Sequence, residues 1–110
     1  MELRGDAKLL RIFIGEQDKY ENRSLYEKIV VMARDAGLAG ATVMKGVFSY
    51  GASSRIHTAK IFDFSQDMPM IVELVDTEEK ISGFIPTLDE VLEHSGSGAL
   101  ITIESVEIIK

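Results

Sequence analysis

The sequence contains no cysteine and no tryptophan, and its 110 residues include only two prolines. The lack of cysteine excludes disulfides, thiolate metal sites and cysteine nucleophiles, and it favours an intracellular location. The net charge of −6 disfavours a nucleic-acid partner, because there is no basic surplus to neutralise phosphates. No apolar run approaches the length of a membrane span, about 20 residues, and the first ten residues have no signal-peptide core. We therefore expect a cytoplasmic protein.

The rest of the composition is typical of one globular domain. Hydrophobic residues make up 45% of the chain and charged residues 27%, which are ordinary values for a folded protein. A chain of this length can bury a substantial core without dividing into parts. We therefore expect residues 1–110 to form a single domain.

Apolar runs predict four main strands. They cover residues 8–14, 41–50, 69–75 and 99–109. In the last strand, Glu104 and Ser105 interrupt the apolar pattern, so a bulge is expected there. The polar segment 16–23 is expected to be a connecting loop. Residues 51–66 are expected to be a flexible loop, or a mobile hairpin tip that re-enters a strand near residues 56–64.

Apolar residues at helical spacing predict two helices. The first is expected to run from Ser24 to Gly37, where Ser24 and Glu27 have the spacing of a capping box. The second is expected between Asp76 and His94, with Asp76 and Glu79 as its capping pair. Because Pro86 removes a backbone hydrogen bond inside the second helix, we expect a kink near residues 82–83 or two shorter helices.

The stretch from Gly37 to Gly51 joins the first helix to the central strand and is rich in glycine. Gly37 has the position of a helix C′ residue, where the left-handed conformation favours glycine. Gly46 lies inside the predicted strand, which indicates either a bulge or a close approach of a ligand or another backbone. One face of this strand is the better candidate for contact with the core: Thr42, Met44, Phe48 and Tyr50.

The order of elements predicts the fold class. A β-α-β-β-α-β order in about 110 residues is typical of the ferredoxin-like split βαβ arrangement. We therefore predict an α+β protein with a four-stranded antiparallel sheet and two helices on one face. The first and third strands are apolar on both faces, whereas a sheet with one wet face alternates. The face without helices is thus expected to be covered by further copies of the chain.

The central strand and its surroundings resemble an uncharacterised PII-like family, which is related to the PII nitrogen-regulatory signalling proteins. The resemblance covers essentially the whole chain. The residues that carry it are 37–43 (GLAGATV), Lys45-Gly46, Tyr50-Gly51, 55–58 (RIHT), Pro69, Glu73 and 78–80 (EEK).

The PII resemblance implies a homotrimer that binds an adenine nucleotide, ATP, ADP or AMP, in the clefts between subunits. It also implies that the loop 51–66 docks on a partner, such as a membrane transporter or an enzyme. Gly40 and Thr42 match the PII residues that face adenine and ribose, and residues 95–98 take the place of its phosphate-binding loop. The predicted nucleotide-binding residues are Gly40, Thr42, Lys45, Gly46, Tyr50, Gly51, Ser95, Gly96, Ser97 and Gly98. The predicted partner-loop residues are Ser53, Ser54, Arg55 and His57.

The sequence departs from PII at the phosphate-binding loop, which is shorter here and has no basic residue. Backbone N–H groups of a glycine-rich turn can still bind an anion, so residues 95–98 are either a phosphate site or an ordinary helix end. The positive charge that binds a phosphate would have to come from other parts of the chain. Each basic residue considered for this role could instead be an ordinary solvated side chain on the surface. The candidates are Arg11, Lys45, Arg55 and Lys60.

No catalytic or metal site is predicted. Ser53 and Ser54 lie near His57 in a predicted flexible loop, which lacks the rigid orientation that activates a nucleophile. His57 and His94 do not have the spacing of metal ligands. Together with this absence, the PII resemblance implies a non-catalytic nucleotide sensor. One alternative is a trimer on the same fold with a structural role, or one that binds a metal or a small anion. Another is a small enzyme or RNA binder on the same fold, which the acidic net charge disfavours.

Overall fold

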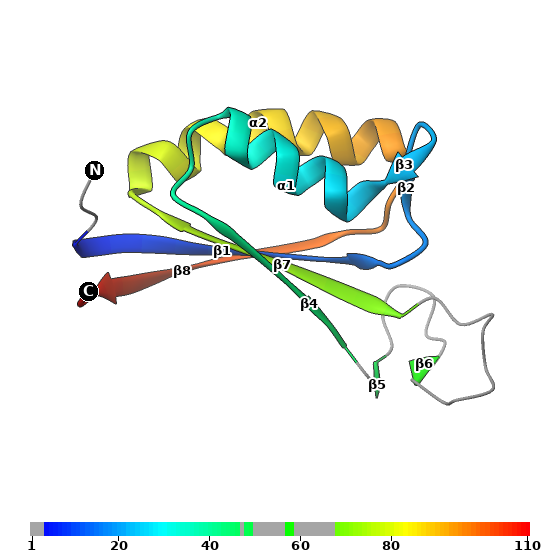
Figure 1. Ribbon diagram of the computed structural model, residues 1–110, viewed down its shortest axis with the longest axis horizontal. Coiled ribbons are helices and arrows are strands. Elements are labelled where there is room, and N and C mark those ends of the chain that lie inside the picture. Colours follow the sequence, from blue (N-terminus) through cyan, green and yellow to red (C-terminus); the bar gives the residue numbers. More distant parts are fainter. Residues whose placement is uncertain (1–3, 47, 50–56, 59–67) are drawn as a thin grey trace.

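Figure 1 shows the protein as a computed structural model, which describes residues 4–46, 48–49, 57–58 and 68–110. A four-stranded sheet has the order β4-β7-β1-β8, and every neighbouring pair is antiparallel. Its strands are β1 (Gly5–Gly15), β4 (Ala41–Lys45), β7 (Pro69–Asp76) and β8 (Leu100–Ile108). Two helices, α1 (Leu25–Asp35) and α2 (Glu78–Ser95), lie together on one face of this sheet. The predicted ferredoxin-like α+β fold is therefore confirmed.

Two short hairpins complete the described elements. β2 (Lys19–Tyr20) pairs with β3 (Arg23–Ser24) inside the segment that was expected to be a loop. β5 (Phe48–Ser49) pairs with β6 (His57–Thr58). The strand predicted over residues 41–50 therefore ends at Lys45, and its continuation belongs to a separate hairpin.

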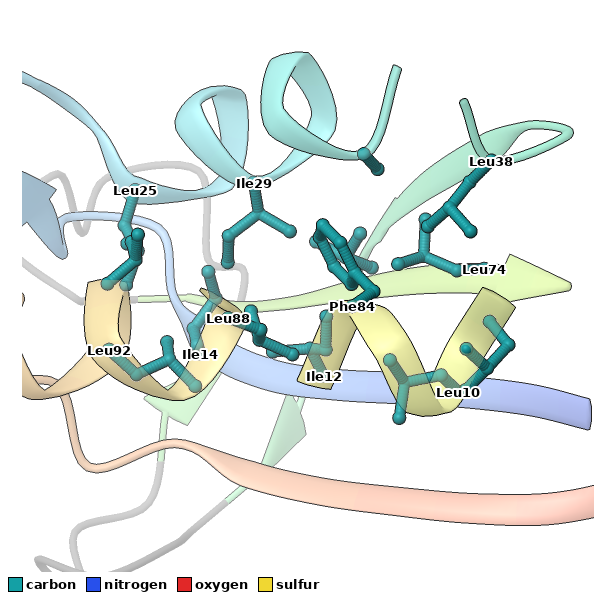
Figure 2. Packing of buried hydrophobic residues seen from close by; sticks show 14 of the residues in the cluster. Leu10, Ile12, Ile14, Leu25, Ile29, Leu38, Leu74, Phe84, Leu88 and Leu92 are labelled. Atoms are coloured by element: carbon teal, nitrogen blue, oxygen red, sulfur yellow. The ribbon is translucent and has the colours of Figure 1, made fainter. Parts of the chain in front are cut away.

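The hydrophobic core lies between the helices and the sheet. Figure 2 shows Leu25 and Ile29 of α1 and Phe84 and Leu88 of α2 pointing toward the strand residues. From the sheet, β1 contributes alternate residues that are almost fully buried: Leu10, Ile12 and Ile14. This period of two in the strand and of three to four in the helices is the apolar pattern that the sequence displays.

The core-facing side of β4 differs from the prediction. Val43 packs against the core, whereas Met44 on the opposite face is 41% exposed. Val43 pairs with Val72, which is fully buried beneath the helices. The prediction of a core face with Thr42 and Met44 is therefore wrong, because the register with β7 decides which face turns inward.

The ends of α1 agree only in part with the sequence. Ser24 is the N-cap residue, but its side chain makes no capping hydrogen bond, so the predicted capping box is absent. At the other end, Gly37 has a φ of 82°, and the N–H of Leu38 donates to the carbonyl of Ala33. Gly37 N–H donates to Arg34, which completes a Schellman motif and confirms the C′ role of this glycine.

The start of α2 is capped by a different residue from the predicted one. Thr77 is the N-cap, and its hydroxyl accepts a hydrogen bond from the N–H of Lys80. Asp76 lies one residue earlier and is buried. α2 continues as one helix through Pro86, so the alternative of two shorter helices is wrong.

β8 pairs with β1 in unbroken register from Gly5 opposite Ile108 to Phe13 opposite Leu100. The bulge predicted at Glu104 and Ser105 is therefore absent. Both residues are exposed, and their polarity reflects an edge strand rather than an irregular backbone.

Candidate functional site

The sheet face opposite the helices carries an apolar row across all four strands. Pairing places Met44 beside Ile71, Ile71 beside Phe13, and Phe13 beside Leu100. Met44 and Leu100 are 41% and 59% exposed, and the two central residues are partly exposed. No helix among the described residues covers this face (Figure 1). Such a row is typical of a surface that another protein chain covers.

A charged cluster lies next to this apolar row. Arg11 at the centre of β1 donates from Nε to Glu73 at 2.6 Å and from Nη1 to Glu104 on β8. The hydrogen bond from Arg11 to Glu73 and the charges of both carboxylates raise the pKa of the guanidinium. Arg11, which the sequence offered as a phosphate-binding charge, is therefore already engaged by two carboxylates.

Gly40 and Thr42 lie at one end of the sheet. Gly40 precedes β4, and Thr42 pairs with Glu73 on the face without helices. A Cβ built on Gly40 would meet nothing within 4 Å, so the space beside this backbone is open. Both residues are exposed and accessible to a ligand.

A buried carboxylate holds the segment that leads to Gly40. Asp76 is 1% exposed, and its two oxygens accept from the N–H of Ala39 at 2.9 Å and of Thr77 at 2.7 Å. Lys80 adds a hydrogen bond from Nζ to the carbonyl of Gly37 at 3.0 Å. Asp76 therefore ties the turn after α1 to the first turn of α2. The spacing to Glu79 predicts only a capping role for Asp76; its position between an apolar strand and a helix is the signal for burial.

Lys45, Gly46 and residues 95–98 lie at the opposite end of the sheet. Antiparallel pairing places Lys45 beside Met70 and Gly15 beside Pro69, at the end where α2 finishes and β8 begins. Gly40 and Thr42 lie at the other end, where β7 finishes. The described members of the predicted nucleotide-binding set therefore lie at two ends of the sheet in one chain. At the second end, Lys45 and Gly46 belong to one edge of the sheet, and residues 95–98 lead into the strand at the other edge.

A neighbouring proline ring leaves no room for a side chain at Gly46. A Cβ at this position would lie 2.6 Å from Cγ of Pro69, and the N–H of Gly46 donates to the Pro69 carbonyl at 2.8 Å. The close approach that a glycine in the predicted strand indicated is therefore real, and within the described residues its partner is Pro69.

The close contact at Gly46 leads to a stability prediction. Gly46→Ala is expected to lower the free energy of unfolding by about 1–3 kcal/mol, because the new methyl group overlaps the proline ring. Gly40→Ala is the matched control and is expected to change it by less than about 1 kcal/mol, since its methyl group has open space. Urea unfolding at one fixed protein concentration measures both. Equal destabilisation of the two variants would contradict this role of Pro69.

Hydrogen bonds within the chain hold the predicted phosphate-binding loop, residues 95–98, in place. Gly96 is the C-cap of α2 with a φ of 72°, and its N–H donates to the carbonyl of Glu93. The N–H of Ser97 donates to Oγ of Ser95 at 3.1 Å, and Ser95 in turn donates to the Leu92 carbonyl at 2.7 Å. The loop therefore ends a helix, and the N–H groups of Gly96 and Ser97 already have acceptors.

An acidic residue that the sequence analysis missed lies against this loop. Oδ2 of Asp18 accepts from the Ser97 hydroxyl at 2.8 Å and from the N–H of Gly15 at 2.9 Å. On the same side, Lys45 forms an ion pair with Glu16 at 2.9 Å. The Gly-x-x-Asp spacing after β1 is the signal for Asp18, since an aspartate often accepts from a nearby backbone N–H in a turn.

Several predicted residues are not placed. Tyr50, Gly51, Ser53, Ser54 and Arg55 lie outside the described residues, as does Lys60. The backbone of His57 is part of β6 and pairs with Ser49.

The other features that bear on a site are few. The rings of His94 and Tyr20 pack against each other at a tilt of 47°, with centroids 4.9 Å apart. Among the described residues there is no group of three His, Asp or Glu side chains that would hold a metal ion. Within the same part of the chain, no helix is both long and apolar enough to cross a membrane.

Solved structures identify the class of this fold. A protein described as PII-like signalling, from Thermus thermophilus, superposes with a TM-score of 0.68 over 98% of this chain and 94% of its own, at 18% identity. CPII, a nitrogen regulatory PII-like protein from Thiomonas intermedia bound to ADP, AMP and bicarbonate, gives 0.63 over 93% and 89% at 15% identity. The fold is therefore PII-like.

The family follows from the sequence. The chain belongs to the DUF190 family, described as Uncharacterized ACR, COG1993, whose model matches residues 7–108. A UPF0166 protein of Aquifex aeolicus is 38% identical over 93% of this chain and 92% of its own. The UPF0166 protein MJ1524 of Methanocaldococcus jannaschii is 38% identical over 94% and 93%. The resemblance to an uncharacterised PII-like family is thereby confirmed.

Proposed function

We propose that this protein is a non-catalytic PII-like sensor, a homotrimer that binds adenine nucleotides between subunits and signals through the loop 51–66. The observation that carries the proposal is the sheet face that no described helix covers, with its row Met44, Ile71, Phe13 and Leu100. On a PII-like fold, further copies of the chain are the natural cover for this face. The bound ADP and AMP of CPII supply the class of ligand.

The predicted nucleotide-binding residues lie at two ends of the sheet, which is consistent with a site formed between two subunits of the proposed trimer. Within one chain, Gly40 precedes β4 and Thr42 is its second residue, whereas Lys45 is its last residue and residues 95–98 lie at that same end of the sheet. Lys45 is three residue steps from Thr42 and five from Gly40, which correspond to about 10 and 17 Å along a strand, and we infer that a nucleotide reaches both ends of the sheet across a subunit boundary. Gly40 and Thr42 of one subunit would face the base and ribose, and the residues at the other end would come from its neighbour.

Two measurements on the purified protein test the proposal together. Light scattering is expected to give the mass of three 12.2-kDa chains. Calorimetric titration is expected to show saturable binding of an adenine nucleotide, with about one site per chain. A trimer that binds none of ATP, ADP, AMP and cyclic AMP would refute nucleotide sensing and leave a structural or small-anion-binding trimer.

Two conservative variants locate the ligand. Thr42→Val keeps the shape of an exposed side chain and removes its hydroxyl, and Gly40→Ala adds a methyl group in open space. Each is expected to weaken nucleotide binding about tenfold, or by about 1.4 kcal/mol, with the trimer intact. Thr42→Val loses a hydrogen bond to the ligand, and Gly40→Ala places a methyl group where the ligand approaches the backbone. Thr87→Ser on the exposed side of α2 is the control and is expected to bind like the wild type. Unchanged binding by both site variants would place the ligand elsewhere.

A further inference from the structure

The charges around residues 95–98 are unusual for a site that holds several phosphates. The carboxylate of Asp18 lies against the loop, and its Oδ2 accepts a hydrogen bond from the hydroxyl of Ser97 at 2.8 Å. Lys45 is neutralised by Glu16, and Arg11 is held between Glu73 and Glu104. Among the described residues, the two basic side chains that the sequence offered for a phosphate, Arg11 and Lys45, are thus already paired with acids.

Most uncharged hydrogen-bond donors of the loop are also engaged within the chain. The N–H groups of Gly96 and Ser97 donate within the chain, and so do the hydroxyls of Ser95 and Ser97. A phosphate at this position would have to break the Ser97–Asp18 hydrogen bond and would then lie close to a carboxylate. Each further phosphate charge adds repulsion of the same sign.

We propose that this site selects adenine nucleotides with few phosphates, so that AMP binds more tightly than ADP, and ADP more tightly than ATP. The inference rests on the proposed function and specifies its ligand. Asp18 is the selectivity-determining residue, because its negative charge disfavours the β- and γ-phosphates. The base and ribose contacts at Gly40 and Thr42 are common to all three nucleotides and do not discriminate among them.

The experiment titrates the wild type, Asp18→Asn and Ser97→Ala with AMP, ADP and ATP at low salt, with and without Mg²⁺. The wild type is expected to bind AMP about tenfold more tightly than ATP. Asp18→Asn removes the charge, keeps an oxygen acceptor, and is expected to strengthen ATP binding about five- to tenfold, since the added phosphate charges no longer meet repulsion from the carboxylate. AMP binding is expected to change less than ATP binding does.

Ser97→Ala distinguishes the effect of the Asp18 charge from the effect of the Ser97–Asp18 hydrogen bond. This variant loses the contact with Asp18 but keeps the carboxylate, so its ratio of ATP to AMP affinity is expected to equal that of the wild type. If Ser97→Ala changed the ratio as much as Asp18→Asn does, loop closure rather than charge would set the selectivity, and the proposal would be wrong.

Other outcomes separate the inference from the function on which it rests. Tighter binding of ATP than of AMP by the wild type, with or without Mg²⁺, would overturn the selectivity and leave the sensor function intact. A trimer that binds none of the nucleotides would overturn both.

If Asp18→Asn does not fold, salt supplies the second test. Raising the ionic strength to about 0.5 M is expected to narrow the wild-type preference for AMP, because screening weakens repulsion between exposed charges. A preference that does not change with salt would contradict the charge mechanism.

Discussion

Phe13→Lys is expected to dissociate the proposed trimer into 12.2-kDa monomers. Phe13 lies in the middle of the apolar row, between Ile71 on β7 and Leu100 on β8. In the assembly, a lysine at this position would be buried without a partner, which costs several kcal/mol in each subunit. Analytical ultracentrifugation or light scattering at micromolar concentration measures the result.

Thr87→Lys is the control for added charge. Thr87 is exposed on α2, on the opposite side of the molecule from the apolar row, so this variant is expected to remain a trimer. The monomeric fold of Phe13→Lys is expected to survive, since Ile12 and Ile14 keep their core contacts on the other face of β1. A trimeric Phe13→Lys variant would show that the sheet face is not the interface.

Asp76→Ala is expected to lower the free energy of unfolding by about 2–4 kcal/mol, because it leaves the N–H groups of Ala39 and Thr77 without their acceptor. Asp76→Asn keeps one oxygen acceptor and is expected to lose about half as much. Denaturant unfolding at fixed protein concentration measures both variants. The control is Glu78→Ala, which removes an exposed carboxylate from the same helix start and is expected to cost less than about 1 kcal/mol.

Asp76 also connects stability to the candidate site. The Ala39 amide that it holds immediately precedes Gly40. Hydrogen exchange at Ala39 is therefore expected to accelerate in Asp76→Asn under conditions where the variant remains fully folded. Slow exchange at Ala39 in this variant would mean that the turn is held mainly by Lys80 and the Schellman motif at Gly37.

Much of the candidate site depends on contacts that sequence spacing does not reveal. The glycines at 37 and 46 were recognisable, because a left-handed helix end and a close approach both require the absence of a side chain. The acidic partner of the 95–98 loop was not, since Asp18 and Ser97 are separated by 79 positions. The role of Asp76 was not recognisable either. Its spacing to Glu79 is that of a capping pair, but its carboxylate accepts a hydrogen bond from the N–H of Ala39.

The sequence by itself determined the order of the two helices and of the four strands of the main sheet, and the family. These properties follow from local periodicity and from motifs that are continuous along the chain. Only the tertiary structure decided which face of β4 turns inward, which residue caps α2 and which acids neutralise Arg11 and Lys45. Strand register and ion pairing join residues that are distant in sequence, and a shift of one residue in register would exchange the two faces of a strand.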